Sequence, residues 1–316
     1  MANNKEKRFC TSIGGQAVLE GVMMRSPKST ATSIRKADGE IVTKTEETKS
    51  ISQKVKFLKL PIIRGCVAFI ESMIIGTKAL MLSAEYFDIE DEEESTSKFD
   101  LWVEKVFGEK LKGFVIGFSI IISLFFSIGL FILIPAFITS LLKIQSNSVK
   151  TLVEGGIKLL IFFAYLVGVS KLKDIRRVFE YHGAEHKTIH CYESGDELTV
   201  ENAKKHSRLH PRCGTSFLFI VLIISIVLFL AVPNSASLSW GSRALYKIIL
   251  LPIVAGFAYE AIKFTGKHTN TLTKIISAPG MALQYITTSE PDDKQLEVAI
   301  AALNAVKPPE RELAAW

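Results

Sequence analysis

Residues 181–193, YHGAEHKTIHCYE, concentrate metal-binding residue types in a chain that is otherwise rich in Phe, Ile and Leu. On a helix, which turns by about 100° per residue, the candidate ligands of this stretch share one face: His182, Glu185, His186, His190 and Glu193. Two imidazoles four residues apart can bind one ion, and the order His182-x-x-Glu185-His186 is that of the inverted zincins. We therefore expect His182 and His186 to bind Zn²⁺ or another divalent transition metal. Glu185 is then the general base that accepts a proton from water activated by the metal.

The third ligand has two possible sources. Glu193 lies on the same helix face, whereas the segment HSRLHPRCGTSF, residues 206–217, offers His210 and Cys213. Five of the six histidines lie between positions 182 and 210. This density favours a metal site over the alternative, in which histidines beside a bilayer hydrogen-bond lipid headgroups. A structural zinc site closes its coordination shell and a catalytic one keeps a position open, and the sequence does not distinguish them.

Basic residues close to the candidate ligands indicate an anionic partner. We expect Lys187, Arg208 and Arg212 to hold a carboxylate or phosphate of a substrate or a lipid. Glu20 and Arg25, in the segment LEGVMMR, either help to bind substrate or fix a turn, and we favour the turn.

The apolar composition indicates a membrane protein. Of 316 residues, 48% are hydrophobic, and the run 114–142 contains no charge; roughly 20 apolar residues cross a hydrocarbon core of about 30 Å. Four spans are predicted in a membrane domain at 114–264, namely 114–142, 152–170, 214–239 and 244–262. The histidine-rich segment, 171–214, connects the second span to the third.

The distribution of Lys and Arg predicts the orientation. Basic residues crowd 171–214 and are few in the other two short connections, so the positive-inside bias puts this segment and both chain ends in the cytoplasm. The N-terminal residues lack the apolar stretch of a secretory signal peptide. The four cysteines are irregularly spaced, and we expect reduced thiols. The net charge of +6 fits this orientation and lipid headgroups, and no aromatic-interleaved basic stripe indicates a nucleic acid partner.

The two ends of the chain are predicted to form one small α+β module in the cytoplasm. In the N-terminal segment, 1–58, two β-favouring runs flank Asp38-Gly39, a strong hairpin signal. The C-terminal segment, 265–316, ends in an amphipathic helix whose apolar face carries Leu296, Ala299, Ile300, Leu303 and Val306. This face needs a surface to bury it, and the N-terminal strands are the expected one.

The segment between the strands and the first span is predicted to lie on the membrane. In 59–87, four charges recur every seven residues and therefore stay near one face, so we expect an interfacial amphipathic helix in preference to a further span. An acidic loop and linker, 88–113, follows. Glu260 lies inside a predicted span, where it either serves a transport pathway or pairs with Lys263 near the helix end.

Five motifs along the chain resemble a known family. GGQAVLEGVMMR, HGAEHKTIHCYE, HPRCGTSF, PGMALQYITTSEPDD and LEVAIAAL occur in the order typical of the YqhQ-like family of bacterial membrane proteins, a domain of unknown function labelled "predicted metal-dependent enzyme". The resemblance implies a polytopic protein of the bacterial inner membrane. It also implies that the motif residues are the ligands or catalysts, namely His182, Glu185, His186, His190, Glu193, His210 and Cys213.

Taken together, the residues predict a polytopic α-helical membrane protein with about four spans, an interfacial amphipathic helix and a small cytoplasmic α+β module. We expect a metal-dependent hydrolase that acts at the cytoplasmic face of the membrane on a peptide, a lipid-linked molecule or a phosphoester. The alternative is a transporter or scaffold without enzymatic activity, possible as a homo-oligomer, in which the histidines form a structural or regulatory metal site.

Overall fold

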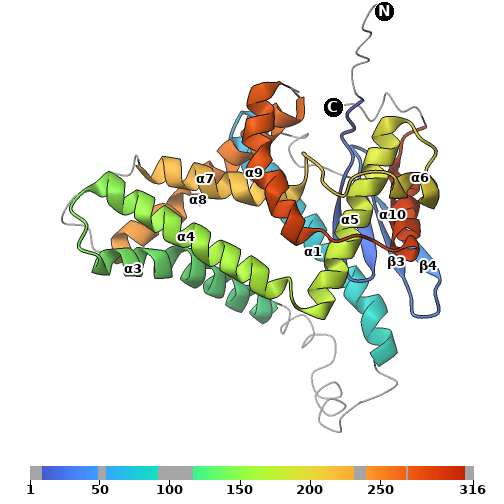
Figure 1. Cartoon of the computed structure of the whole chain (residues 1–316), viewed down its shortest axis with the longest axis horizontal. Helices are drawn as coiled ribbons and strands as arrows, with labels where there is room; N and C mark the ends of the chain where they lie inside the picture. The colour runs from blue at the N-terminus through green and yellow to red at the C-terminus, as the bar shows by residue number, and fades with distance from the viewer. Residues whose placement is uncertain (1–8, 49–54, 92–116, 231–239, 268–269, 310–316) are drawn as a thin grey trace, which may run out of the picture. The chain divides into compact units, whose positions relative to one another are not determined.

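The structure is a computed structural model that describes residues 9–48, 55–91, 117–230, 240–267 and 270–309 (Figure 1). The chain divides into two compact units, which are described separately. The first unit contains Met1–Phe87, Leu166–Val221 and Ala255–Trp316. The second contains Asp88–Tyr165 and Leu222–Val254. The first unit therefore joins both ends of the chain to the histidine-rich segment.

A four-stranded antiparallel sheet in the first unit follows the order of the sequence, β1-β2-β3-β4. Its strands are β1 (Gly14–Val18), β2 (Gly21–Arg25), β3 (Ser29–Arg35) and β4 (Ile41–Glu47). The predicted hairpin at Asp38-Gly39 is confirmed, and it connects β3 to β4. Gly39 has φ 88° and its N–H donates to Lys36 O at 2.9 Å, so a glycine is needed where the backbone enters the left-handed region.

Both faces of this sheet are covered, which explains why β2 is apolar without alternation. On one face, Val22 and Met24 pack into a core with α5 (Lys173–Ser194) and α10 (Asp293–Val306), which lie beside the strands in Figure 1. On the other face, Met23 and Val18 contact Ala79 of α1 (Ile63–Asp91). The strands are therefore the middle layer between two helical layers.

The predicted C-terminal helix is confirmed as α10, and its apolar face packs on the sheet as expected. Of the five residues assigned to that face, all but Ile300 are buried, and Ile300 packs against the core from a partly buried position. The helix begins after Asp292, which accepts a hydrogen bond from Gln295 N–H while the Gln295 side chain accepts one from Asp292 N–H. This capping box fixes the start of the helix next to the histidine-rich segment.

The remaining elements are helical. They are η2 (Lys56–Lys59), η3 (Gly129–Leu133), α3 (Ile134–Leu141), α4 (Asn147–Val169), α6 (Val200–Lys204), α7 (Gly214–Leu230), α8 (Trp240–Lys267) and α9 (Thr271–Thr287). Within the described ranges, four stretches are long and apolar enough to cross a membrane: Ile63–Tyr86, Gly117–Leu141, Ser148–Val169 and Ala244–Thr265. Large apolar side chains on them are exposed, as Phe125 is at 71%, which suits contact with lipid tails.

The helices match the predicted spans with two differences. Three of the four predicted spans correspond to long apolar helices, whereas 214–239 corresponds to the shorter α7, and residues 231–239 lie outside the described ranges. The segment 59–87, which we expected to lie on the membrane surface, contains α1, which is also long and apolar enough to span. Most of the predicted acidic loop, 88–113, lies outside the described ranges, and its first residues continue α1 to Asp91.

Glu260 on α8 pairs with Arg64 of α1, and Lys263, the partner considered from the sequence, also lies close enough to interact with it electrostatically. Arg64 donates two hydrogen bonds to its carboxylate, at 2.6 and 2.5 Å. The helices approach closely at this point because Gly65 faces Gly256: a Cβ on Gly65 would lie 2.9 Å from Gly256 Cα. Two glycines thus allow the contact that brings Arg64 to Glu260.

Candidate metal centre

Helix α5 carries the predicted ligands, and its helical conformation confirms the spacing argument. The helix ends at Gly195, which has φ 82°, and the N–H of Gly195 donates to Tyr192 O at 3.2 Å. Gly183, inside the helix, allows the chain after α9 to approach: Ser289 N–H donates to Phe179 O at 2.8 Å, and a Cβ on Gly183 would overlap the Ser289 carbonyl oxygen. The glycine costs helix propensity but permits this packing.

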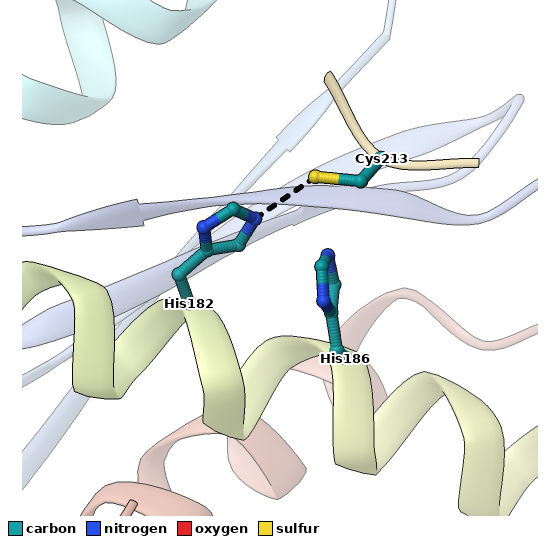
Figure 2. A group of neighbouring side chains, drawn as sticks. All are labelled: His182, His186 and Cys213. Carbon is teal, nitrogen blue, oxygen red and sulfur yellow. Dashed lines mark hydrogen bonds between the residues drawn. The ribbon is translucent and has the colours of Figure 1, made fainter. Parts of the chain in front are cut away.

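His182, His186 and Cys213 converge on one point (Figure 2). The two imidazoles extend from the same side of α5, and Cys213 faces them from the segment just before α7. Their ligand atoms all lie within 4.8 Å of one another. Two histidines and one cysteine form an ordinary ligand set for zinc.

Each imidazole is oriented by a backbone carbonyl. His182 Nδ1 lies 2.8 Å from Thr287 O, at the end of α9, and His186 Nδ1 lies 2.5 Å from Arg208 O. A carbonyl only accepts, so both Nδ1 atoms are the protonated ones and both Nε2 atoms present lone pairs. Carbonyl partners of this kind are typical of metal-binding histidines.

The two Nε2 atoms face the cysteine side of the cluster. His182 Nε2 is 3.0 Å from Cys213 Sγ, so the thiol is its donor. His186 Nε2 is buried and has no hydrogen-bond partner among the described residues. A buried lone pair without a donor is costly, and a metal ion would satisfy it. The residues present therefore fit a divalent transition metal.

Burial sets the protonation of the ligands. Burial lowers the pKa of His186 to about 4, which keeps the imidazole neutral. Burial alone would raise the pKa of the Cys213 thiol, but nearby His186 and hydrogen bonds from Thr215 outweigh it and lower that pKa. Neutral imidazole and thiolate are the forms that bind metals.

Glu185 lies in the same turn of α5 and is 5% exposed. It packs on β1, where a Cβ on Gly15 would be 2.9 Å from Glu185 Cδ, and the Gly15 N–H donates to its carboxylate. Its Oε2 is buried and has no hydrogen-bond partner among the described residues. Burial raises the pKa of Glu185 to about 7, with His182 opposing the shift. A carboxyl group with this pKa exchanges protons near neutral pH.

The other predicted ligands form a second group, His190, Glu193 and His210. Glu193 accepts from Thr11 N–H at 2.7 Å and is also ion-paired with Arg212. His210 Nδ1 accepts from Arg212 N–H at 3.3 Å, and His190 Nε2 lies 3.0 Å from Leu209 O. The guanidinium already neutralises the carboxylate and repels a cation. The structure thus separates the predicted ligands into two groups: Cys213 lies with His182 and His186, and Glu193 and His210 lie with His190.

A third group, Cys191, Asp196 and His206, lies at the end of α5. His206 Nε2 is 2.9 Å from Asp196 Oδ2, and the Asp196 side chain is 51% exposed. His206 and Asp196 therefore form an ordinary surface pair. It lacks the carbonyl-anchored imidazoles of the first group.

The basic residues expected to hold an anion are engaged with the protein. Arg208 donates to the Thr288 hydroxyl at 2.6 Å, and Lys187 Nζ lies 2.5 Å from Glu290 Oε1. Arg212 pairs with Glu193. These contacts fasten the chain after α9 to the histidine-rich segment, so all three have structural partners in this arrangement.

Glu20 also fixes the fold around the centre, in line with the turn interpretation. It stands in the β1–β2 turn with φ 48°. Arg177 donates to both of its carboxylate oxygens, and the Tyr181 hydroxyl donates to Oε2 at 3.1 Å. Glu20 thus fastens the turn to α5 one turn before His182.

Residues of α9 support the centre and were not singled out from the sequence. Gln284 accepts from His210 N–H at 2.7 Å and donates to His210 O at 2.8 Å, while Thr287 O anchors His182. Both residues belong to the motif PGMALQYITTSEPDD. The sequence did offer a signal for Gln284, because it is a Gln in a largely apolar segment. A side-chain amide buried there requires hydrogen-bond partners.

Comparison with known proteins places these residues in a family context. Residues 60–308 match a family model described as "Protein of unknown function (DUF1385)". The chain is 36% identical over 296 residues to "Uncharacterized protein YqhQ" of Bacillus subtilis (strain 168), an alignment that covers 93% of this chain and 91% of the relative. No solved structure matches the chain.

Proposed function

The chain belongs to the DUF1385 family, and from the geometry of its centre we propose that it is a metal-dependent hydrolase of the membrane surface. The observation that carries this proposal is the orphaned lone pair of His186 Nε2, buried beside His182 Nε2 and Cys213 Sγ. Three protein ligands are what catalytic zinc sites provide, since a fourth position is left for water or substrate. A structural site would need a fourth protein ligand.

His182, His186 and Cys213 would hold the ion, and Glu185 would move the proton. A divalent metal at this point would polarise a carbonyl or phosphoryl oxygen and acidify a water molecule. Glu185 accepts the proton from the attacking water and later delivers it to the leaving group, because its carboxyl group is buried, has one free oxygen and lies between the two ligating histidines in the sequence. The Gly15 N–H holds the other side of that carboxylate.

The membrane setting supports a reaction at the cytoplasmic face of the bacterial inner membrane. The basic character of 171–214 supports an orientation with both ends of the chain in the cytoplasm. The sheet supports a shallow position for the second half of α1, because strand residues contact it: Arg25 lies 3.7 Å from Glu71, and Met23 packs on Ala79. Polar strands are not tolerated in lipid. We therefore propose that α1 lies at or beyond the headgroups from Glu71 onwards.

The alternative of a transporter depends on intramembrane acids that are free to exchange ions. Glu260 is held by two hydrogen bonds from Arg64 and Glu154 is ion-paired with Lys247, and such closed pairs favour a structural role for both acids. We therefore favour the hydrolase, whose substrate would be a peptide, a lipid-linked molecule or a phosphoester.

The proposal is tested on the purified full-length protein in mild detergent. Metal content is measured by plasma mass spectrometry, and hydrolysis is measured with fluorescent casein, bis(p-nitrophenyl) phosphate and p-nitrophenyl acyl esters. We expect wild-type protein to carry one metal per chain, and His186→Ala and Cys213→Ala to carry none. Glu185→Gln keeps the shape and the contact with Gly15, so it should retain the metal and lose about 100-fold or more of the hydrolysis that the wild type shows.

His206→Ala is the matched control, because His206 belongs to the surface pair with Asp196. It should retain both metal and hydrolysis. Stoichiometric metal that survives Cys213→Ala, or hydrolysis that survives Glu185→Gln, would contradict the proposed roles.

A further inference from the structure

Three buried ionisable side chains meet inside the second unit. Glu154 and Lys158 lie on α4 and Lys247 lies on α8, and they are 4%, 6% and 3% exposed. All three belong to helices that are long and apolar enough to cross a membrane. Ionisable residues in such helices are expensive to bury, which makes each of them a candidate for function.

The cluster contains more positive than negative charge. Lys247 Nζ forms an ion pair with Glu154. Lys158 forms no hydrogen bond or ion pair with the described residues; its Nζ lies 5.1 Å from the centre of the Phe229 ring. Lys158 follows Glu154 by one helical turn, so the two share a face of α4. The group is thus a carboxylate with two ammonium groups.

Phe229 on α7 lies beside both amines. Lys247 Nζ lies 5.5 Å from the centre of the same ring. The face of an aromatic ring attracts a cation, and a neutral amine gains nothing comparable from it. A ring attracts an ammonium group without neutralising it, so among the described residues two ammonium groups share one carboxylate, and burying an unpaired charge is costly.

We propose that Lys158 and Lys247, beside Phe229, bind a singly charged phosphate group. A phosphate monoanion would make the cluster neutral and offer acceptors to both ammonium groups. Lys158 lies ten residues after the start of the apolar stretch at Ser148, about 15 Å along the helix. The Lys158 side chain leans toward that same end, as Cβ atoms on helices do. The phosphate comes either from an acidic phospholipid or from inorganic phosphate in solution.

This site is independent of the proposed hydrolase, because none of its residues contacts the metal ligands or Glu185 in the described contacts. Its function is to admit an anion between the apolar helices. Failure of the proposed metal centre therefore leaves the proposed phosphate site unaffected, and the reverse also holds.

The test measures thermal unfolding of the full-length protein, since a ligand of the folded state raises the unfolding midpoint. In one arm the protein is in neutral detergent with increasing sodium phosphate, below the second pKa of phosphate, against sodium chloride at equal ionic strength. In the other arm it is in nanodiscs of phosphatidylglycerol, against phosphatidylcholine. We expect the midpoint to rise in at least one arm, and the arm that responds identifies the source.

Variants separate this site from general charge effects. Lys158→Met leaves a neutral Glu154–Lys247 pair and should fold while losing the rise. Glu154→Gln leaves two ammonium groups, so its midpoint should be lower without phosphate and should rise further with it. Lys150→Met, on the same helix but only half-buried, should behave as the wild type. The proposal is overturned if the wild type responds in neither arm, if chloride acts as strongly as phosphate, or if Lys158→Met keeps the full rise.

Discussion

Gly183→Ala is expected to weaken metal binding without touching a ligand. An alanine Cβ at this position would lie closer than 3.0 Å to the Ser289 carbonyl oxygen, a separation that real Cβ atoms essentially never show. The Ser289 carbonyl oxygen is a backbone atom and cannot rotate away as a side chain can. The segment after α9 must therefore move away from α5. Two residues before Ser289, at the end of α9, Thr287 O is the 2.8 Å partner of His182 Nδ1, so this shift should displace it.

The size of the effect follows from two opposing terms. Overpacking costs about 1–3 kcal/mol, and alanine regains up to about 1 kcal/mol of helix propensity. A net loss of up to about 2 kcal/mol in the free energy of unfolding remains. Losing the carbonyl that orients a ligating histidine typically weakens metal binding by about 10–100-fold.

The assay is zinc competition against a chromophoric chelator, combined with thermal unfolding in detergent. Gly156→Ala is the matched control, because Gly156 also lies inside a helix and has nothing within 4 Å of its added Cβ. We expect it to bind zinc as the wild type does and to be equally or more stable. Unchanged zinc affinity in Gly183→Ala would refute the inference that this close approach orients His182.

Three further predictions use other contacts. Chelation of the metal should lower the unfolding midpoint, and added zinc should restore it, because a ligand of the folded state stabilises it; a midpoint unmoved by chelation would argue against a bound ion. Asp292→Ala should cost about 1 kcal/mol in denaturant unfolding through loss of the α10 capping box, an expectation that fails if the midpoint is unchanged. Arg64→Met should destabilise more than the double variant Arg64→Met/Glu260→Gln, since the single change leaves a carboxylate without its partner; equal stability of the two would show that the pair is solvated.

Local patterns predicted the elements that carry the centre. The H-x-x-E-H order and the helical spacing identified His182, Glu185 and His186 on one face, and the Asp38-Gly39 turn identified a hairpin. The grouping of Cys213, and not Glu193, with His182 and His186 could not be predicted, because it depends on contacts between distant segments such as the ion pair of Arg212 with Glu193. The Arg64 partner of Glu260 is separated from it by 196 positions, and sequence spacing carries no information about such a contact.

The anchor for His182 has a consequence for biosynthesis. The ligating histidines are translated more than a hundred positions before Thr287, and the strand beneath Glu185 comes near the very beginning of the chain. A nascent polypeptide that has not yet delivered α9 from the ribosome lacks the carbonyl that turns the first imidazole. In the proposed metal centre, loading would therefore follow the synthesis of α9, and chains terminated before α9 should emerge without the ion.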